Sequence, residues 1–123
     1  MAEIIILDQF SRNMFRETPR SFSHDVQALV LAQEAVALGL DAELPTEQRT
    51  FLYMPYMHSE SLRIHEEAVR LFTLNGVKEN LDFEYRHKVI IERFGRYPHR
   101  NAILGRESSP EEVAFLNEPG SSF

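Results

Sequence analysis

Cysteine is absent from the 123 residues, and glycine and proline are few, at 5 and 6. The lack of cysteine excludes disulfides, thiolate metal sites and cysteine nucleophiles. No run of about 18 apolar residues occurs, which argues against a membrane span. The N-terminus, MAEIIILDQF, has neither a basic segment nor a cleavage site, so we expect no export signal and a cytoplasmic protein.

The charge balance limits the partners. The net charge is −6, with 43% hydrophobic and 26% charged residues, a composition that predicts one soluble globular domain over residues 1–123. Nucleic-acid binding depends on neutralising phosphates, so the acidic balance argues against nucleic acid as a partner. We expect neither a nucleic-acid nor a membrane partner.

The spacing of apolar residues and of helix-ending residues predicts an all-α fold. Short connections between such helices favour antiparallel helical hairpins, about five to six helices in all. Pro55 is expected to interrupt the third helix, Ser59 to cap the fourth, and Ser109 with Glu112 to form a capping box before the last. The expected helices cover residues 2–17, 25–38, 45–54, 60–74, 78–94 and 110–117.

Two of these helices have more apolar surface than one neighbour can cover. In the first, four consecutive apolar residues point in all directions, because each advances by about 100° around a helix; they are Ile4, Ile5, Ile6 and Leu7. In the second, large residues such as Val26 and Val30 lie opposite a strip of Ala28 and Ala32. An uncovered N-terminal helix predicts self-association through that helix.

One basic segment stands out in this acidic chain. Residues 86–106 contain six Lys or Arg and one Glu, whereas the rest of the chain has 7 bases and 18 acids. The loop expected at 95–107 carries six polar side chains: Arg96, Tyr97, His99, Arg100, Asn101 and Arg106. These side chains are suited to bind a small anion such as a phosphate or carboxylate. The alternative is that they pin the loop to the helices by hydrogen bonds to the backbone.

Metal and cofactor motifs are weak or missing. Glu84 and His87 have the Glu-x-x-His spacing of helical di-iron sites, but no second copy occurs, so we predict no metal site and interpret His87 as a core residue. His58 and His65, seven residues apart, are expected to face the core as well. No glycine-rich phosphate loop, nucleophile elbow or His-Glu-x-x-His motif is present. The sequence therefore predicts no cofactor.

Four segments resemble one known family when they are read together. They are Leu7–Asn13 (LDQFSRN), His58–Glu60 (HSE), Arg93–Asn101 (RFGRYPHRN) and Asn117–Phe123 (NEPGSSF). They resemble the bacterial family called domain of unknown function 924, nearly over the whole length and in the same order. The resemblance implies a tetratricopeptide-like, right-handed helical array and no established activity. Ser11 stands where the family usually has proline, and we expect this chain to lack the N-terminal portion usual for the family.

The polar positions that match the family motifs form the candidate ligand-binding cluster. They are Asp8, Gln9, Arg12, Asn13, His58, Glu60, Arg96, His99, Arg100 and Asn101. Our first hypothesis is an α-helical interaction module that forms a homo-oligomer. The alternative is a small-anion-binding protein or enzyme that uses this cluster, with Asp8 or His99 as its acid or base. A buried structural network would produce the same pattern.

Overall fold

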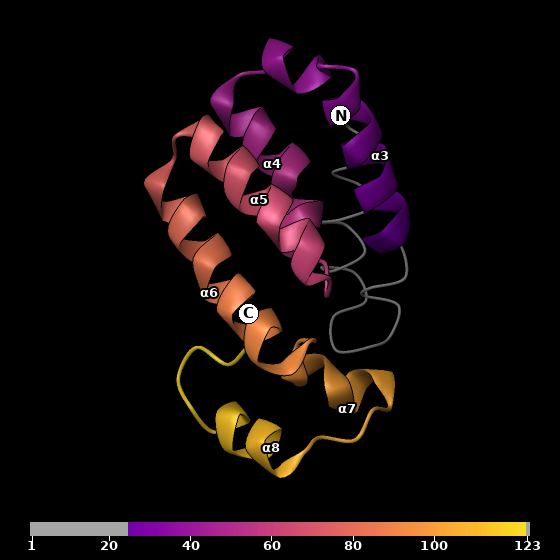
Figure 1. Ribbon diagram of the computed structural model, residues 1–123, viewed down its shortest axis with the longest axis vertical. Helices are drawn as coiled ribbons and strands as arrows, with labels where there is room; N and C mark the ends of the chain where they lie inside the picture. The colour runs from indigo at the N-terminus through magenta and orange to yellow at the C-terminus, as the bar shows by residue number, and fades with distance from the viewer. Residues whose placement is uncertain (1–24, 123) are drawn as a thin grey trace.

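The computed structural model describes residues 25–122, and this part of the chain is helical, without strands (Figure 1). The α-helices are α3 (Asp25–Ala37), α4 (Thr46–Met57), α5 (Leu62–Asn75), α6 (Lys78–Phe94), α7 (Asn101–Leu104) and α8 (Pro110–Leu116), with 3-10 turns η3 (Leu40–Glu43) and η4 (Pro98–Arg100). The all-α prediction is confirmed, whereas the tetratricopeptide-like arrangement stays a prediction. The helix expected at 2–17 lies outside the described residues.

Helices α4, α5 and α6 are sequential neighbours, and α3 packs along α4. The short connections force each helix to reverse direction. Gly76 ends α5 with a φ of 78°, a left-handed conformation in which a side chain would be strained. The next residue, Val77, is the N-cap of α6, so the connection is very short. Gly95 ends α6 in the same way, with a φ of 73°. The chain then turns across the end of α6, where Figure 1 shows α7 and α8 together.

The apolar core has two parts. The larger lies between α3, α4 and α5 and contains Ala32, Leu52, Tyr53, Tyr56, Met57, Ala68, Leu71 and Phe72. The smaller joins α6 to the C-terminal segment and contains Ile90, Ile91, Tyr97 and Phe115. The second core fixes the connection between α6 and α8 against the helical layer, and this connection carries most of the candidate site.

Helix α4 differs from the prediction at its end. Pro55 was expected to interrupt it, but the helix continues through this residue to Met57. A proline inside a helix removes one hydrogen bond, here the one from residue 55 to the carbonyl of Phe51. Burial compensates for this loss, because Tyr56 and Met57 are each only 4% exposed.

The start of α5 also moves. Its N-cap is Ser61 rather than Ser59, because the Ser61 hydroxyl accepts a hydrogen bond from the backbone of Ile64. Ser59 instead accepts one from the backbone of Ser61. The extension of α4 to Met57 leaves a short link in which Glu60 is free to reach the C-terminal segment.

Three further expectations concern the remaining segments. The alanine strip of α3 is buried, with Ala28 and Ala32 both 0% exposed. The capping box of Ser109 and Glu112 is present at the start of α8. The loop at 95–107 was expected to be irregular, but it contains η4 and α7.

Within residues 25–122, no helix combines the length and apolarity needed to cross a membrane.

Candidate functional site

The link between α4 and α5 is tied to the C-terminal segment through Glu60. Arg106 donates to both carboxylate oxygens of Glu60, Nη1 to Oε1 at 2.9 Å and Nη2 to Oε2 at 3.0 Å. The backbone N–H of Tyr97 donates to Oε2 at 2.7 Å. Burial alone raises the pKa of Glu60, but these hydrogen bonds outweigh it and lower the pKa overall. Glu60 is therefore a charged anchor for the loop.

A second pair of this kind holds the start of α8. Arg96 donates to both oxygens of Glu112, Nη2 to Oε1 at 2.7 Å and Nε to Oε2 at 2.9 Å. The Ser109 backbone N–H also donates to Glu112 Oε1, at 2.9 Å. The hydrogen bonds from Arg96, above all, lower the pKa of Glu112 to about 2. The same carboxylate thus caps α8 and neutralises Arg96.

Asn101 connects the two pairs. Its Oδ1 accepts from Arg106 Nε at 3.0 Å, while its Nδ2 donates to Glu112 Oε2 at 3.3 Å and to Ser108 Oγ at 3.1 Å. Asn101 is 1% exposed, so these bonds satisfy an amide that water does not reach. We call the connected residues the polar brace; its members are Glu60, Arg96, Asn101, Arg106 and Glu112.

Tyr97, whose backbone contacts the polar brace at Glu60, has its side chain buried in the interior. Its hydroxyl donates to the carbonyl of Met57 at 2.6 Å. His65 Nε2 lies 2.8 Å from the hydroxyl oxygen of Tyr97. His65 Nε2 is also 2.7 Å from the carbonyl of Ser59, which requires a proton on Nε2. His65 Nδ1 lies 2.8 Å from Oε2 of Glu84. Glu84, His65 and Tyr97, which we call the buried triad, are each 0% exposed.

The buried triad has a defined charge. Burial raises the pKa of Glu84, which favours a carboxyl proton shared with the ring of His65. The contact between His65 Nδ1 and Glu84 Oε2 needs one proton, whichever of the two atoms carries it, and His65 Nε2 carries a second proton. With both protons present, His65 and Glu84 together have no net charge. The other oxygen of Glu84, Oε1, accepts no hydrogen bond from any residue of the described part of the chain. The triad therefore contributes polar contacts without net charge to a sealed interior.

Arg100 and His99 surround the ring of Tyr97. The Arg100 guanidinium lies 4.7 Å from the ring centroid, and its Nη2 donates to the carbonyl of His58 at 2.9 Å. Its Nη1 is 3.9 Å from Oδ2 of Asp25, at the start of α3. The His99 ring centroid is 5.9 Å from that of Tyr97. With 4% of its surface exposed, Arg100 ties three helical elements together from inside.

Six members of the predicted cluster lie within the described residues: His58, Glu60, Arg96, His99, Arg100 and Asn101. Glu60, His99 and Arg100 contact Tyr97. The His58 carbonyl accepts from Arg100, and Arg96 and Asn101 both donate to Glu112. The other four, Asp8, Gln9, Arg12 and Asn13, lie outside the described residues. Binding of a ligand by this cluster stays a prediction. The guanidiniums of Arg96 and Arg106 are paired with glutamates of the same chain.

Sequence reasoning missed several residues of the network. Tyr97 and Arg106 were noted only as loop residues, and Glu112 only as a cap. Glu84 was considered beside His87, but its carboxylate contacts His65 on α5. His87 instead hydrogen-bonds the Phe83 carbonyl through Nδ1 at 2.7 Å.

The signal for Glu84 was present in the spacing on α6. Phe83 is 50% exposed whereas Glu84 is 0% exposed, so the buried side of α6 runs through Glu84, His87 and Ile91. An acidic residue on the buried stripe with His87 and Ile91 indicates a buried polar partner on the neighbouring helix. Burial lowers the pKa of His87 to about 3, so His87 is a neutral core residue, as predicted.

The site offers no arrangement for metal chemistry within residues 25–122, where no three His, Asp or Glu side chains gather in a way that could hold an ion. What it does contain is a set of acid–arginine pairs and a sealed, net-neutral triad. These features define an all-helical protein whose C-terminal segment is braced onto a helical layer by buried polar contacts.

Comparison with known proteins gives one family and one similar structure. Residues 1–120 match the family described as "Bacterial protein of unknown function (DUF924)", and the chain belongs to this family. A solved structure of a protein of unknown function from Agrobacterium tumefaciens, ATU0120, is similar, with 40% identity and a TM-score of 0.89. The match covers 94% of this chain and 65% of that one. A search of the curated proteins finds no match.

Proposed function

We propose that this chain is an α-helical interaction module that self-associates through an apolar surface on the outer side of α3. The single observation that carries the proposal is the division of α3 into two apolar sides. Ala28 and Ala32 are 0% exposed, whereas Val26 and Val30 are 76% and 53% exposed. We call the exposed residues the α3 apolar surface; it consists of Val26, Val30, Leu38 and Leu40.

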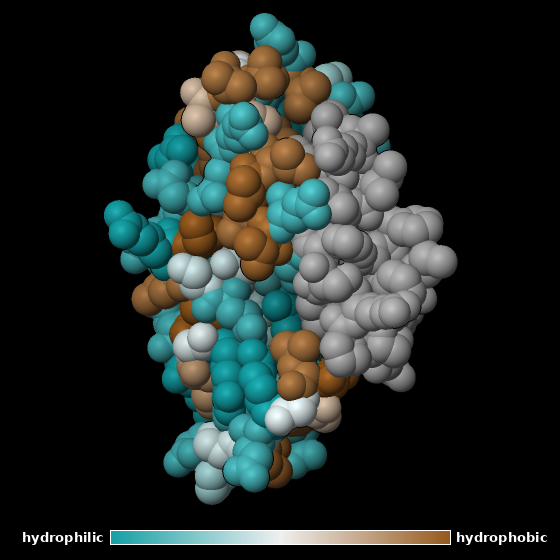
Figure 2. Space-filling model, turned by 90° about the vertical axis from the view of Figure 1, so that its right-hand side faces the viewer, coloured by the Kyte–Doolittle hydropathy of each residue, from teal (hydrophilic) through white to brown (hydrophobic). Residues whose placement is uncertain are grey.

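The surroundings of this surface support an apolar partner. Leu38 and Leu40, just after α3, are 68% and 48% exposed. Figure 2, viewed from the α3 side, shows apolar side chains gathered over the upper half of that face. Apolar patches on a protein surface are typical of association surfaces.

The charge pattern of α3 favours a second copy as the partner. Asp25 and Glu34 are the only charged residues among its 13. In a symmetric dimer the same surface meets itself, so like charges would be brought together. A surface with few charges and several aliphatic side chains avoids this repulsion while burying apolar area.

Light scattering over a concentration series tests the proposal. Wild type is expected to form a dimer in the range of about 10–100 μM, the affinity of a small interface. Replacing Val26→Glu together with Val30→Glu places like charges on the association surface and is expected to give a monomer. Val113→Glu on α8, where Val113 is 51% exposed, is the matched control and should leave the dimer intact.

Two outcomes would overturn the proposal. One is a wild-type chain that stays monomeric at about 1 mM, well above the expected dissociation constant. The other is a Val113→Glu variant that dissociates as readily as the α3 variant. Circular dichroism of both variants establishes that each remains folded.

A further inference from the structure

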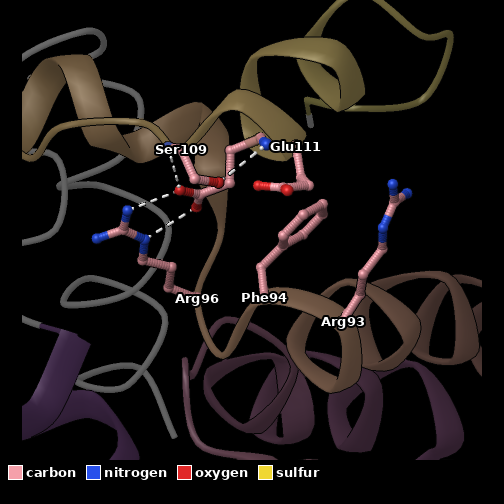
Figure 3. A pocket seen from close by; sticks show the side chains of 6 residues that line it. Arg93, Phe94, Arg96, Ser109 and Glu111 are labelled. Carbon is pink, nitrogen blue, oxygen red and sulfur yellow. Dashed lines mark hydrogen bonds and ion pairs between the residues drawn. The ribbon is translucent and has the colours of Figure 1, made fainter.

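A pocket lies at the opposite end of the described chain from η3, between the end of α6 and the start of α8 (Figure 3). Its volume is about 550 Å³, within the range of pockets that hold small molecules. The lining residues come from two segments that the polar brace holds at a fixed separation. They are Arg93, Phe94, Arg96, Ser109, Glu111 and Glu112.

Four charged side chains line this pocket, and only two of them pair with each other. Arg96 and Glu112 neutralise each other through two hydrogen bonds of 2.9 and 2.7 Å, and so form one wall. Arg93 and Glu111, by contrast, form no ion pair or hydrogen bond with any residue of the described chain. The pocket therefore presents one available cation and one available anion.

Phe94 lies between these two charges. In Figure 3 its ring stands between the carboxylate of Glu111 and the guanidinium of Arg93. The Arg93 guanidinium is 4.7 Å from the centroid of this ring and 5.7 Å from that of Phe115. Stacking of this kind orients a guanidinium while leaving its N–H groups available for a carboxylate.

A ligand for this pocket must satisfy both charges. A simple anion would gain from Arg93 but would be repelled by Glu111, and a simple cation would meet the opposite difficulty. A net-neutral ligand with two separated charges avoids both penalties. Because a phenylalanine ring separates the two protein charges, the ligand charges must be several bonds apart, with an apolar group between them.

We propose that this pocket binds short peptide-like zwitterions, of which a dipeptide with an apolar side chain is the simplest. The terminal carboxylate pairs with Arg93, the terminal ammonium pairs with Glu111, and the apolar side chain packs on Phe94. The proposal does not depend on self-association, since no residue of the α3 apolar surface lines the pocket.

Three probes with one common body test it. They are leucyl-alanine, its N-acetyl derivative, which lacks the ammonium, and its C-terminal amide, which lacks the carboxylate. Titrations are followed by the backbone amide signals of the full chain in ¹H–¹⁵N NMR spectra. Leucyl-alanine is expected to shift signals of the lining residues and to bind about fivefold more tightly than either derivative, the effect of one exposed ion pair.

Two variants assign each charge to its partner. Arg93→Gln should bind leucyl-alanine and its amide equally, because the carboxylate has lost its partner. Glu111→Gln should bind leucyl-alanine and the N-acetyl derivative equally. Arg86→Gln and Glu92→Gln, at exposed α6 positions that do not line the pocket, are matched controls and should retain the wild-type preference.

The spectra also report whether each variant is folded, so loss of binding is separable from unfolding. Equal binding of the three probes to wild type would overturn the proposal, as would shifts confined to residues away from the pocket. Retention of the wild-type preference in Arg93→Gln or Glu111→Gln would overturn the assigned contacts. A chain that is monomeric yet shows the expected preference would reject self-association and leave this site standing.

Discussion

His65 on α5 and Glu84 on α6 place Nδ1 and Oε2 2.8 Å apart, and both side chains are 0% exposed. Two polar groups removed from water are stable only where each finds a partner. His65 has a second contact, to the hydroxyl of Tyr97 at 2.8 Å. The pair therefore couples the packing of two neighbouring helices to the position of the C-terminal segment.

Removal of the Tyr97 hydroxyl tests this coupling. Tyr97→Phe leaves the Met57 carbonyl and His65 Nε2 without their shared partner, and is expected to lower the free energy of unfolding by about 1–3 kcal/mol. Urea denaturation measures the change. Tyr85→Phe is the control, because Tyr85 is 47% exposed, and it should change stability little. An equal loss in both variants would contradict the role assigned to the hydroxyl.

The Glu60–Arg106 pair is expected to contribute more than an ordinary surface pair. Its side chains are 24% and 27% exposed and meet through two parallel hydrogen bonds, whereas Glu67 and Arg70 are both 53% exposed. A double-mutant cycle with Glu60→Gln and Arg106→Gln should give a coupling energy of about 1–2 kcal/mol. The same cycle on Glu67 and Arg70 should give about 0.3–0.5 kcal/mol. Similar coupling in both pairs would argue against a bracing role.

The buried His87 predicts how stability depends on pH. Burial lowers its pKa from 6.5 to about 3, so between these values the unfolded chain binds a proton that the folded chain does not. Stability therefore falls as the pH is lowered through this range, and the loss between pH 7 and pH 5 is about 2 kcal/mol. His87→Gln should remove this part of the dependence. Denaturant titrations of both proteins at the two pH values measure it, and parallel losses would refute the assignment.

The sequence predicted much of the helical layer because its signals are local. Gly76 and Gly95 end helices as expected, and the Ser109–Glu112 capping box begins α8. The errors arose where burial outweighed a local preference. Pro55 should end a helix by its own chemistry, but the packing of Tyr56 and Met57 continues α4 beyond it.

The candidate site was predicted less completely. The motifs shared with the family pointed to His58, Glu60 and the Arg96–Asn101 segment. In the structure Glu60 and Arg100 contact Tyr97, and Arg100 donates to the His58 carbonyl. The partner of each side chain could not be read from the sequence. Glu60 and Arg106, which form two hydrogen bonds, are 46 positions apart, and no periodicity relates residues across such a separation.

By itself, the sequence determined the helical class, most helix ends and the concentration of polar residues in one C-terminal segment. These properties depend on backbone preferences and spacing along the chain, which act over a few residues. The tertiary structure decided which charges are neutralised within the chain and which remain available. Arg96 and Arg93 are three positions apart and both line the pocket. The packing of α8 against α6 brings Glu112 to Arg96, whereas Arg93 pairs with no acid among the described residues.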